Sequence, residues 1–280
     1  MLFVSAERIA VIVEGDKREL DYWEQIKRYF FPKKSIDFLT LAAGENIYML
    51  WKKMKEDDFE TDIIEVVREY SSQSAEKLNG LTRTQFSEIY LFFDLDPHQN
   101  NLKKEDTGSF FEVLREMIES FDNETENGKL FISYPMCEAI RDFKDATSCM
   151  AFYKCKITIE EVRSYKQFTG DRNANSIINQ YDFDKWMTIL SVFLYRCRCL
   201  YGKPLESRDI LQWYRKKVNI KGIFQIEKQL LESRGLVFVL SAFPEFLLDY
   251  FSMDYWKTLP NYIDRIGDPN CNVNTLSDSK

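Results

Sequence analysis

Acidic side chains stand just after three short apolar runs of this sequence, where they could act together on a metal ion or a phosphate. Glu14 follows RIAVIV, Asp94 and Asp96 follow IYLFF, and Glu138 comes shortly after KLFIS. Short runs of β-branched and aromatic residues bounded by turn residues are typical of buried strands. Ligand-binding groups of an open α/β sheet gather at the carboxyl ends of its strands, so we expect these acids to converge in space.

Asp94 and Asp96 give the strongest indication of a metal site. They are two residues apart, so in an extended chain their side chains leave the same face. Two carboxylates held close together repel each other unless they share a proton or a cation. Mg²⁺ takes hard oxygen ligands, keeps several waters and binds substrate phosphates, so the pattern predicts a site for Mg²⁺ or Mn²⁺.

The segment around Glu14 resembles the first motif of a Toprim domain, in the form found in the RloB and OLD branches of phage-defence nucleases. RloB-type proteins show EGxxTE at this point, followed by an aromatic pair. The sequence EGDKRELDYW has Arg18 in place of the usual threonine and matches the motif at Glu14, Gly15, Glu19, Tyr22 and Trp23.

Two later segments extend the resemblance. The second motif of these proteins is DxD after an apolar strand, which Asp94 and Asp96 match. The third is SNPxFE, and SYPMCE matches it at Ser133, Pro135 and Glu138, with a tyrosine and a cysteine as departures. The order of the three motifs is therefore the one found in Toprim proteins.

The resemblance implies a metal-dependent nuclease in which Glu14, Asp94 and Asp96 hold the first Mg²⁺. Glu19 and Glu138 would complete a second metal site, or Glu14 would act as a general acid or base. Two metal ions about 4 Å apart clamp the attacking water and the leaving oxygen of an in-line displacement. The implied reaction is hydrolysis of phosphodiester bonds.

Two further residues have roles that follow from the resemblance. Ser133 would orient a phosphate by hydrogen bonding, and Lys166, in the pair Tyr165-Lys166, would neutralise developing charge. Abortive-infection proteins that work with an ATPase use such a Toprim unit, so we expect the nuclease effector of an anti-phage defence system, acting on DNA or RNA, tRNA included. The chain has no GxxxxGKS/T motif, so ATP hydrolysis would come from the partner. Assembly into a homo-oligomer stays open.

Two other functions are compatible with the acidic residues. A glycosyltransferase also uses a DxD motif, which binds Mn²⁺ and a nucleotide sugar, but its fold requires neither the Glu14-Gly15 turn nor the third motif. A non-catalytic Toprim scaffold that binds a partner protein is the second alternative. The five intact acids count against it, because a site without activity would tolerate their loss.

The alternation of strands and helices predicts an α/β fold with a Toprim-like, mostly parallel sheet flanked by helices and a helical C-terminal region. We expect the Toprim-like domain over residues 1–170, with a helical insertion at about 45–85, then the helical region over 171–266 and a flexible tail over 267–280. Strands are predicted at 8–13, 35–41, 89–93 and 129–132, helices at 20–31, 46–55, 61–70, 109–121, 177–201, 208–234 and 245–251, a loop at 71–84, and the start of a further helix near residue 136.

Charge is distributed unevenly along the chain. The net charge of −7 argues against unaided adhesion to nucleic acid, yet Arg141–Arg234 holds 18 basic against 11 acidic residues. This surplus indicates either a basic face that follows a phosphate backbone or ordinary solvated helices.

Composition also limits the compartment and the metal chemistry. No segment approaches the roughly 20 apolar residues of a membrane span, and the first residues lack the features of a signal peptide, so we expect a cytoplasmic protein that does not enter membranes. The six cysteines have no CxxC spacing. We therefore expect reduced and largely buried thiols rather than a zinc site.

Overall fold

The computed structural model describes residues 7–15, 17–32, 36–98, 110–143, 155–171, 178–203 and 207–266. Within it the chain divides into two compact units, Met1–Ile132 and Ser133–Lys280. The sequence places a boundary near residue 170 instead. The difference arises because β6 (Lys156–Thr158) pairs antiparallel with β7 (Leu236–Phe238), which ties the segment after residue 155 to the later unit. The predicted tail lies outside the described residues.

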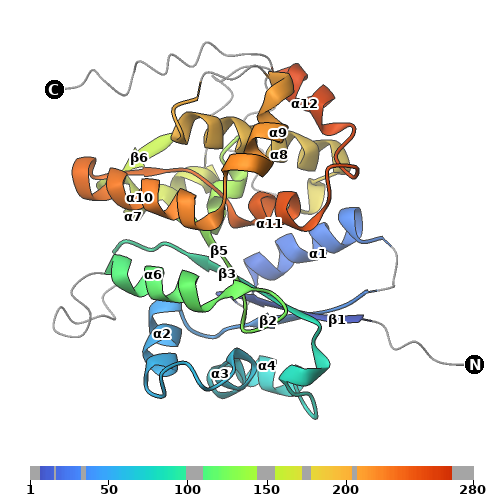
Figure 1. Ribbon diagram of the computed structural model, residues 1–280, viewed down its shortest axis with the longest axis vertical. Coiled ribbons are helices and arrows are strands. Elements are labelled where there is room, and N and C mark those ends of the chain that lie inside the picture. The colour runs from blue at the N-terminus through green and yellow to red at the C-terminus, as the bar shows by residue number, and fades with distance from the viewer. Residues whose placement is uncertain are drawn as a thin grey trace, which may run out of the picture. The chain divides into compact units, whose positions relative to one another are not determined.

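The first unit is built on a five-stranded sheet with the order β2-β1-β3-β5-β4 (Figure 1). Its strands are β1 (Glu7–Val13), β2 (Ile36–Ala42), β3 (Glu88–Asp94), β4 (Asp122–Asn123) and β5 (Gly128–Ser133). β1 lies between β2 and β3 and is parallel to both, and its last five residues are fully buried. The α/β class and the mostly parallel sheet are therefore confirmed, and each predicted strand is present with ends that differ by one residue.

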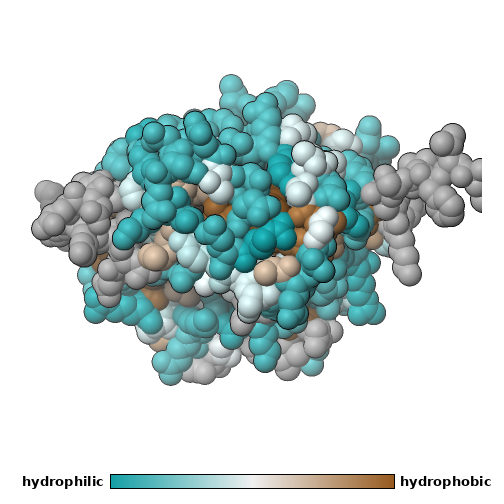
Figure 2. Space-filling model, turned by 90° about the horizontal axis from the view of Figure 1, so that it is seen from below, coloured by the Kyte–Doolittle hydropathy of each residue, from teal (hydrophilic) through white to brown (hydrophobic). Residues whose placement is uncertain are grey.

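Helices cover both faces of this sheet, with α1 on one side and α2, α3 and α4 on the other (Figure 1). Trp23 anchors α1, because its ring lies 5.5 Å from Phe38 of β2 and 5.6 Å from Phe92 of β3, measured between centroids. The surface over α2, α3 and α4 is mostly hydrophilic (Figure 2). The helices of this unit are α1 (Arg18–Phe30), α2 (Ile47–Lys55), α3 (Ile63–Tyr70), α4 (Ser72–Lys77) and α6 (Phe110–Ser120).

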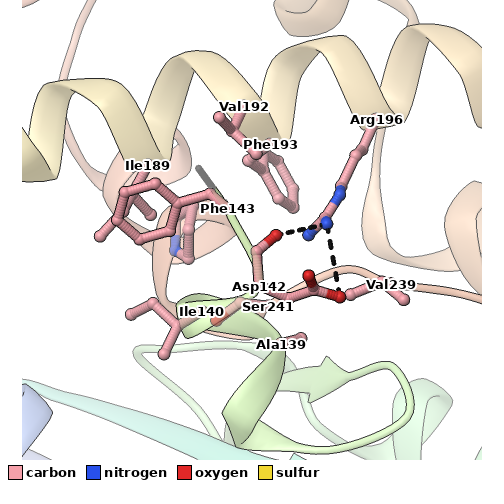
Figure 3. A pocket seen from close by; sticks show the side chains of 11 residues that line it. Ala139, Ile140, Asp142, Phe143, Ile189, Val192, Phe193, Arg196, Val239 and Ser241 are labelled. Carbon is pink, nitrogen blue, oxygen red and sulfur yellow. Dashed lines mark hydrogen bonds and ion pairs between the residues drawn. The ribbon is translucent and has the colours of Figure 1, made fainter. Parts of the chain in front are cut away.

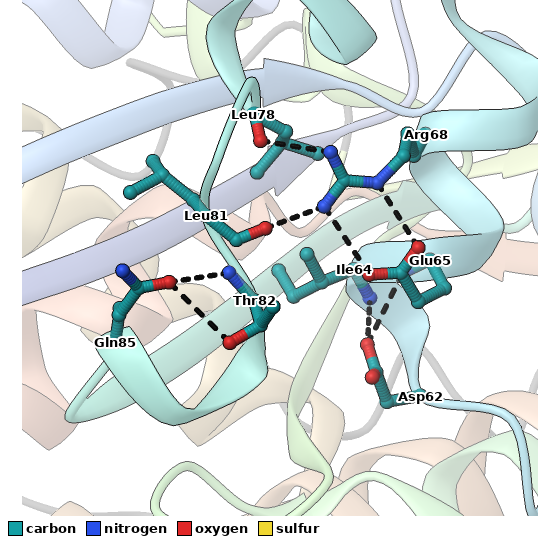
Figure 4. Close-up of polar contacts among 8 residues, drawn as sticks. All are labelled: Asp62, Ile64, Glu65, Arg68, Leu78, Leu81, Thr82 and Gln85. Carbon is teal, nitrogen blue, oxygen red and sulfur yellow. Dashed lines mark hydrogen bonds and ion pairs between the residues drawn. The ribbon is translucent and has the colours of Figure 1, made fainter.

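Residues 71–84, predicted as a loop, contain α4 and the start of the 3₁₀ helix η1 (Arg83–Gln85). Arg68 of α3 explains much of this order, since its guanidinium donates to the carbonyl oxygens of Leu78, at 2.8 Å, and Leu81, at 2.5 Å (Figure 4). The loop prediction was wrong because Arg68 binds carbonyl groups 10 and 13 residues away, and the Ser71 hydroxyl caps α4 by accepting from the Ser74 amide.

The second unit surrounds α8 (Phe183–Leu200), a helix buried over most of its length. Helices α9 (Ser207–Lys217), α11 (Ala242–Tyr250) and α12 (Leu259–Ile266) pack against it. The remaining helices of this unit are α7 (Ile159–Asp171), α10 (Ile220–Arg234) and the 3₁₀ helices η2 (Cys137–Arg141) and η5 (Ile178–Gln180). The helical C-terminal region is confirmed, and none of the described helices is long and apolar enough to cross a membrane.

The single helix predicted at 208–234 is two helices, α9 and α10. Asn219 separates them, because its side chain accepts a hydrogen bond from the Gly222 amide at 2.8 Å and so caps the start of α10. The helix expected near residue 136 is only the short η2, and the sequence patterns predicted none of β4, β6, β7, α7 and α12.

Glu227 of α10 is a carboxyl group buried in the second unit, with an exposed fraction of 1%. One of its oxygens accepts a hydrogen bond from the Phe238 amide at 3.0 Å, and the other has no hydrogen-bond partner among the described residues. Burial raises the pKa of Glu227 well above its ordinary value, against the smaller effect of that hydrogen bond. The carboxyl group is therefore protonated in the fold at pH values where the unfolded chain has lost the proton.

Glu227→Gln should stabilise the protein increasingly as the pH rises. A raised folded-state pKa means that the stability of the wild type is greatest below the unfolded pKa and falls as the pH rises toward the folded one. The variant avoids this loss, so its free energy of unfolding should exceed that of the wild type by about 1.4 kcal/mol more per pH unit within that window. Urea unfolding between pH 4 and pH 8 measures the difference. Glu232→Gln, an exposed change on the same helix, is the control, and its difference from the wild type should not depend on pH. If the difference for Glu227→Gln is equally independent of pH, the assignment is contradicted.

Candidate functional site

The register of β1 and β3 brings Glu14 and Asp94 together. Val13 pairs with Phe92, so both chains leave the sheet side by side, and the Glu14 amide still donates to the Phe92 carbonyl at 3.2 Å. The Asp94 amide in turn donates to the Glu14 carboxylate at 3.2 Å. These two residues therefore lie close together at the end of the sheet.

Glu19 lies in the first turn of α1 and joins this pair. One of its carboxylate oxygens lies within 4.8 Å of one from Asp94. The carboxylate of Glu19 also lies over Gly15: a Cβ at position 15 would be 2.6 Å from Glu19 Oε2. Gly15 thus leaves the space that Glu19 occupies, and the buried Trp23, one turn later, holds α1 in place.

Asp96 is placed by a turn and not by the strand. β3 ends at Asp94, Leu95 is buried, and Asp96 has φ = 36°, which is in the left-handed region. The argument that Asp94 and Asp96 leave the same face of an extended strand was therefore wrong in its premise, because the chain is no longer extended at Asp96. Both carboxylates are partly exposed.

Tyr48 is a member of this site that sequence reasoning missed. It is buried in the first turn of α2, and its hydroxyl donates to the carbonyl of Leu95, between the two aspartates. Burial raises the pKa of Tyr48 well above its ordinary value, and the charges of Asp96, Glu14 and Asp94 add to that effect. The phenol therefore stays a hydrogen-bond donor at neutral pH. Its only indication in the sequence is its place near the start of the helix predicted over residues 46–55.

Carboxylate oxygens dominate this end of the sheet. Glu14, Glu19, Asp94 and Asp96 carry four acidic groups, and the Leu95 carbonyl between the aspartates is engaged by Tyr48. Gathered negative charge raises the free energy of the site unless a cation or a proton compensates it. Carboxylate oxygens are the kind of ligand that hard divalent cations prefer.

The other predicted site residues belong to the second unit. Glu138 is buried in η2, and its carboxylate lies 3.6 Å from the Lys166 ammonium and 3.5 Å from the Arg141 guanidinium. Burial opposes ionisation of Glu138 and would raise its pKa. The opposite effects are larger and lower the pKa: the positive charge of Lys166, a hydrogen bond from Cys137 and the positive charge of Arg141. Glu138 is therefore an ionised, charge-compensated carboxylate, while the Lys166 side chain is 67% exposed.

Ser133 closes β5 and is also buried. Its hydroxyl oxygen accepts a hydrogen bond from the Ala242 amide at 3.3 Å. Ala242 is the first residue of α11, so Ser133 satisfies one of the free amide groups at the start of that helix. The hydroxyl thus has a structural partner within its own unit.

Comparison with known proteins identifies no relative of this chain. No protein-family model, curated protein or solved structure matches this chain. The chemistry of the acidic site has to be derived from its own side chains.

A small cavity in the second unit is lined mainly by apolar side chains around one ion pair (Figure 3). Arg196 donates to the Asp142 carbonyl at 2.5 Å and lies 3.7 Å from the Asp142 carboxylate, which also accepts from the Tyr165 hydroxyl at 2.9 Å. These opposite charges compensate each other inside the cavity. We therefore assign the cavity to the packing of the unit.

The basic surplus of Arg141–Arg234 does not form one exposed face among the described residues. Arg141, Arg196 and Arg198 are buried, with exposed fractions of 4%, 3% and 5%. Desolvated guanidinium groups need partners: Arg196 is paired with Asp142, and Arg141 with Glu138. Only part of the surplus is left to bind a phosphate backbone.

Cys155 and Cys199 form a thiol pair that sequence reasoning did not anticipate. Both are partly exposed, and their side chains share a hydrogen bond. That bond lowers the pKa of Cys155 to about 7, assisted by the charge of Arg196 and opposed by burial. The pKa of Cys199 is raised, because its proton is held in the same bond.

Cys155 should be the most reactive of the four described thiols. Its thiolate is half-formed at about pH 7, so its alkylation by iodoacetamide should reach half its maximal rate there. Cys199→Ala removes the hydrogen-bond donor and should slow the reaction at pH 7 by about 5- to 10-fold as the pKa returns toward that of a free thiol. Peptide mass spectrometry measures each site, with the buried Cys197 as the unreactive control. An unchanged rate in the variant would exclude the thiol pair.

Proposed function

We propose that this chain hydrolyses phosphodiester bonds of nucleic acid with a divalent cation, Mg²⁺ or Mn²⁺, held by the acidic site of the first unit. The observation that carries the proposal is the hydrogen bond from the Asp94 amide to the Glu14 carboxylate, with Glu19 close by. It joins acids from the first and second Toprim-like motifs, which are 80 residues apart in the chain.

The donor set fits the cation. Glu14, Asp94 and Asp96 would hold it, and Glu19 would serve the same ion or a second one. All are carboxylates, the ligands that Mg²⁺ prefers, and partial exposure leaves room for waters and a phosphate. When bound, the metal polarises a phosphoryl oxygen and lowers the pKa of a coordinated water.

The protein's own groups fix the geometry of this site. The Asp94 amide orients Glu14, and Trp23 anchors the helix that carries Glu19. Tyr48 holds the Leu95 carbonyl, and with it the turn between the two aspartates. Ligands held before the cation arrives lose less conformational freedom when they bind it.

The role of Lys166 in neutralising charge on a phosphate rests on the resemblance of the motifs. Within the second unit its exposed ammonium group lies 3.6 Å from the Glu138 carboxylate. The Ser133 hydroxyl oxygen accepts from the Ala242 amide, and in the predicted phosphate role its own O–H group would donate to the phosphate. The setting in anti-phage defence, with an ATPase partner, rests on the resemblance of the motifs to RloB and OLD proteins.

Asp94→Asn should abolish both metal binding and cleavage. Wild-type protein should gain about 2.7 kcal/mol of stability at a Mg²⁺ concentration 100 times the dissociation constant. The variant should show no gain, and cleavage of plasmid DNA and of tRNA should fall by more than the roughly 100-fold of outer-shell changes. Thermal unfolding and gel electrophoresis measure the two effects.

Asp21→Asn is the matched control for this experiment. Asp21 is an exposed aspartate on α1, the helix that also carries Glu19. The control should keep the metal response and the cleavage rate of the wild type. The proposal fails if Asp94→Asn retains a normal response to Mg²⁺, or if metal-loaded wild-type protein cleaves neither substrate.

Gly15→Ala tests the position of Glu19 without removing any ligand. The added methyl group would displace the Glu19 carboxylate, which is the mobile end of its side chain, so the free energy of unfolding without metal should change little. The Mg²⁺ affinity should fall by about 10- to 100-fold, as it does when support for a ligand is lost. Gly170→Ala, with open space around its Cβ, is the control and should leave the affinity unchanged. Equal affinities for both variants would remove Glu19 from the metal site.

A further inference from the structure

An exposed aromatic turn joins α11 to α12 in the second unit. Among the described residues, Met253 and Tyr255 are two of three large apolar side chains that are exposed, at 44% and 40%. The third, Phe183, lies at the start of α8 and is 38% exposed. Two such side chains in one short turn need an explanation, because exposed apolar groups usually stand singly.

The turn presents the ring of Tyr255 in a fixed orientation. Tyr255 stacks on Phe251 with 3.9 Å between ring centroids and 18° between ring planes. The fully buried Trp256 packs edge-on against both, at 4.9 Å from Tyr255 and 5.8 Å from Phe251. Tyr255 is thus a supported aromatic surface with part of its ring open to solvent.

Positive charge lies beside this turn. The Arg215 guanidinium, in the last turn of α9, donates to the carbonyl oxygens of Leu248 and, at 2.7 Å, Phe251. The end of α9 is therefore held next to the aromatic turn. Lys216 and Lys217 follow there, both exposed, and neither forms an ion pair with any residue that the structure describes.

The local balance of charge is positive although the protein is acidic. Two exposed acids share the surface, Asp249 and Asp254, and Asp254 lies 3.6 Å from the ammonium of Lys257. Arg215, Lys216 and Lys217 add three positive charges. The turn therefore combines an open aromatic ring with a surplus of cations, which is the combination that single-stranded nucleic acid binds.

We propose that Tyr255, supported by Phe251, stacks on an unpaired base of single-stranded nucleic acid while Lys216 and Lys217 bind its phosphates. This inference rests on the proposed function and names where a nuclease of net charge −7 holds its substrate. Nucleic acid is favoured over a protein partner because the two lysines lack acidic partners within the described part of the chain, and phosphates supply them. A base within a duplex is already stacked on both sides, so the surface selects unpaired nucleotides.

Fluorescence anisotropy of a labelled oligothymidylate of about 20 nucleotides, longer than a site of about 4–16 nucleotides, tests this inference. The measurement is made in EDTA, so that no metal bridges the phosphates to the acidic site. The single strand should bind more tightly than its duplex with oligoadenylate. Tyr255→Ala should weaken binding of the single strand by about 5- to 150-fold, the range that corresponds to the loss of one stacked base.

Three further variants make the result specific. Tyr255→Phe keeps the ring and should bind like the wild type. Phe183→Ala removes an aromatic side chain of similar exposure elsewhere in the unit and should also bind normally. Lys216→Glu with Lys217→Glu should weaken binding at every sequence and flatten the log–log salt dependence by about one unit for each phosphate that the protein no longer neutralises.

The inference is overturned if Tyr255→Ala, shown by thermal unfolding to be folded, binds the single strand like the wild type. It is equally overturned if Phe183→Ala loses as much affinity for the single strand as Tyr255→Ala. It is also overturned if wild-type protein binds neither oligonucleotide, in which case the turn is a surface for another partner. Failure of the nuclease proposal is distinguishable: Tyr255-dependent binding would persist in a protein that cleaves nothing with Mg²⁺. Conversely, normal metal-dependent cleavage with no effect of Tyr255→Ala on binding would refute this surface alone.

Discussion

The parallel pairing of β1 with β3 is the constraint on which the acidic site depends. Because Val13 lies opposite Phe92, Asp94 lies one residue beyond the level of Glu14, and its amide can donate to the Glu14 carboxylate. A shift of one residue in this register would turn Glu14 to the other face. The complete burial of Ile9–Val13 opposes that shift, because each of these close-packed side chains would have to repack against the opposite face of the sheet.

Negative charge gathered at the end of this sheet is unfavourable, and contacts within the fold offset the repulsion. Glu19 stays near Asp94 because Gly15 leaves space for its carboxylate and Trp23 fastens its helix to the sheet. Tyr48 keeps its proton beside these acids and holds the turn at Leu95. Hydrophobic packing therefore supplies the free energy that keeps like charges close, and a cation that relieves their repulsion would bind in return.

The second unit handles charge differently. Glu138 and Asp142 are buried, but each has cationic partners, which lower the pKa of Glu138 and keep Asp142 paired with Arg196. Several of the basic residues counted in Arg141–Arg234 are therefore part of the interior. The cations that remain available, such as Lys216 and Lys217 at the end of α9, lie beside an aromatic turn instead of forming a broad basic face.

Elements with strong local patterns were predictable from the sequence. The continuous apolar runs before Glu14 and Asp94 are strands, and parallel topology follows from their alternation with helices. The failures came where local composition was ambiguous. Polar residues 71–84 fold because Arg68 bonds to distant carbonyl groups, and the helix expected over 208–234 is interrupted by the cap at Asn219.

The sequence by itself determined which acids end β1 and β3, because strand ends follow from apolar runs and turn residues. Only the tertiary structure decided which groups surround them: Tyr48 beneath the Leu95 turn, Glu19 over Gly15, and Asp96 in a left-handed turn outside the strand. The same holds for the thiol pair Cys155–Cys199 and for the ring of Tyr255. The contacts of Tyr48 and of the thiol pair join segments far apart in the chain, which no local pattern of residues encodes. The other arrangements are local in sequence, but they depend on side-chain and backbone conformations that the surrounding packing selects.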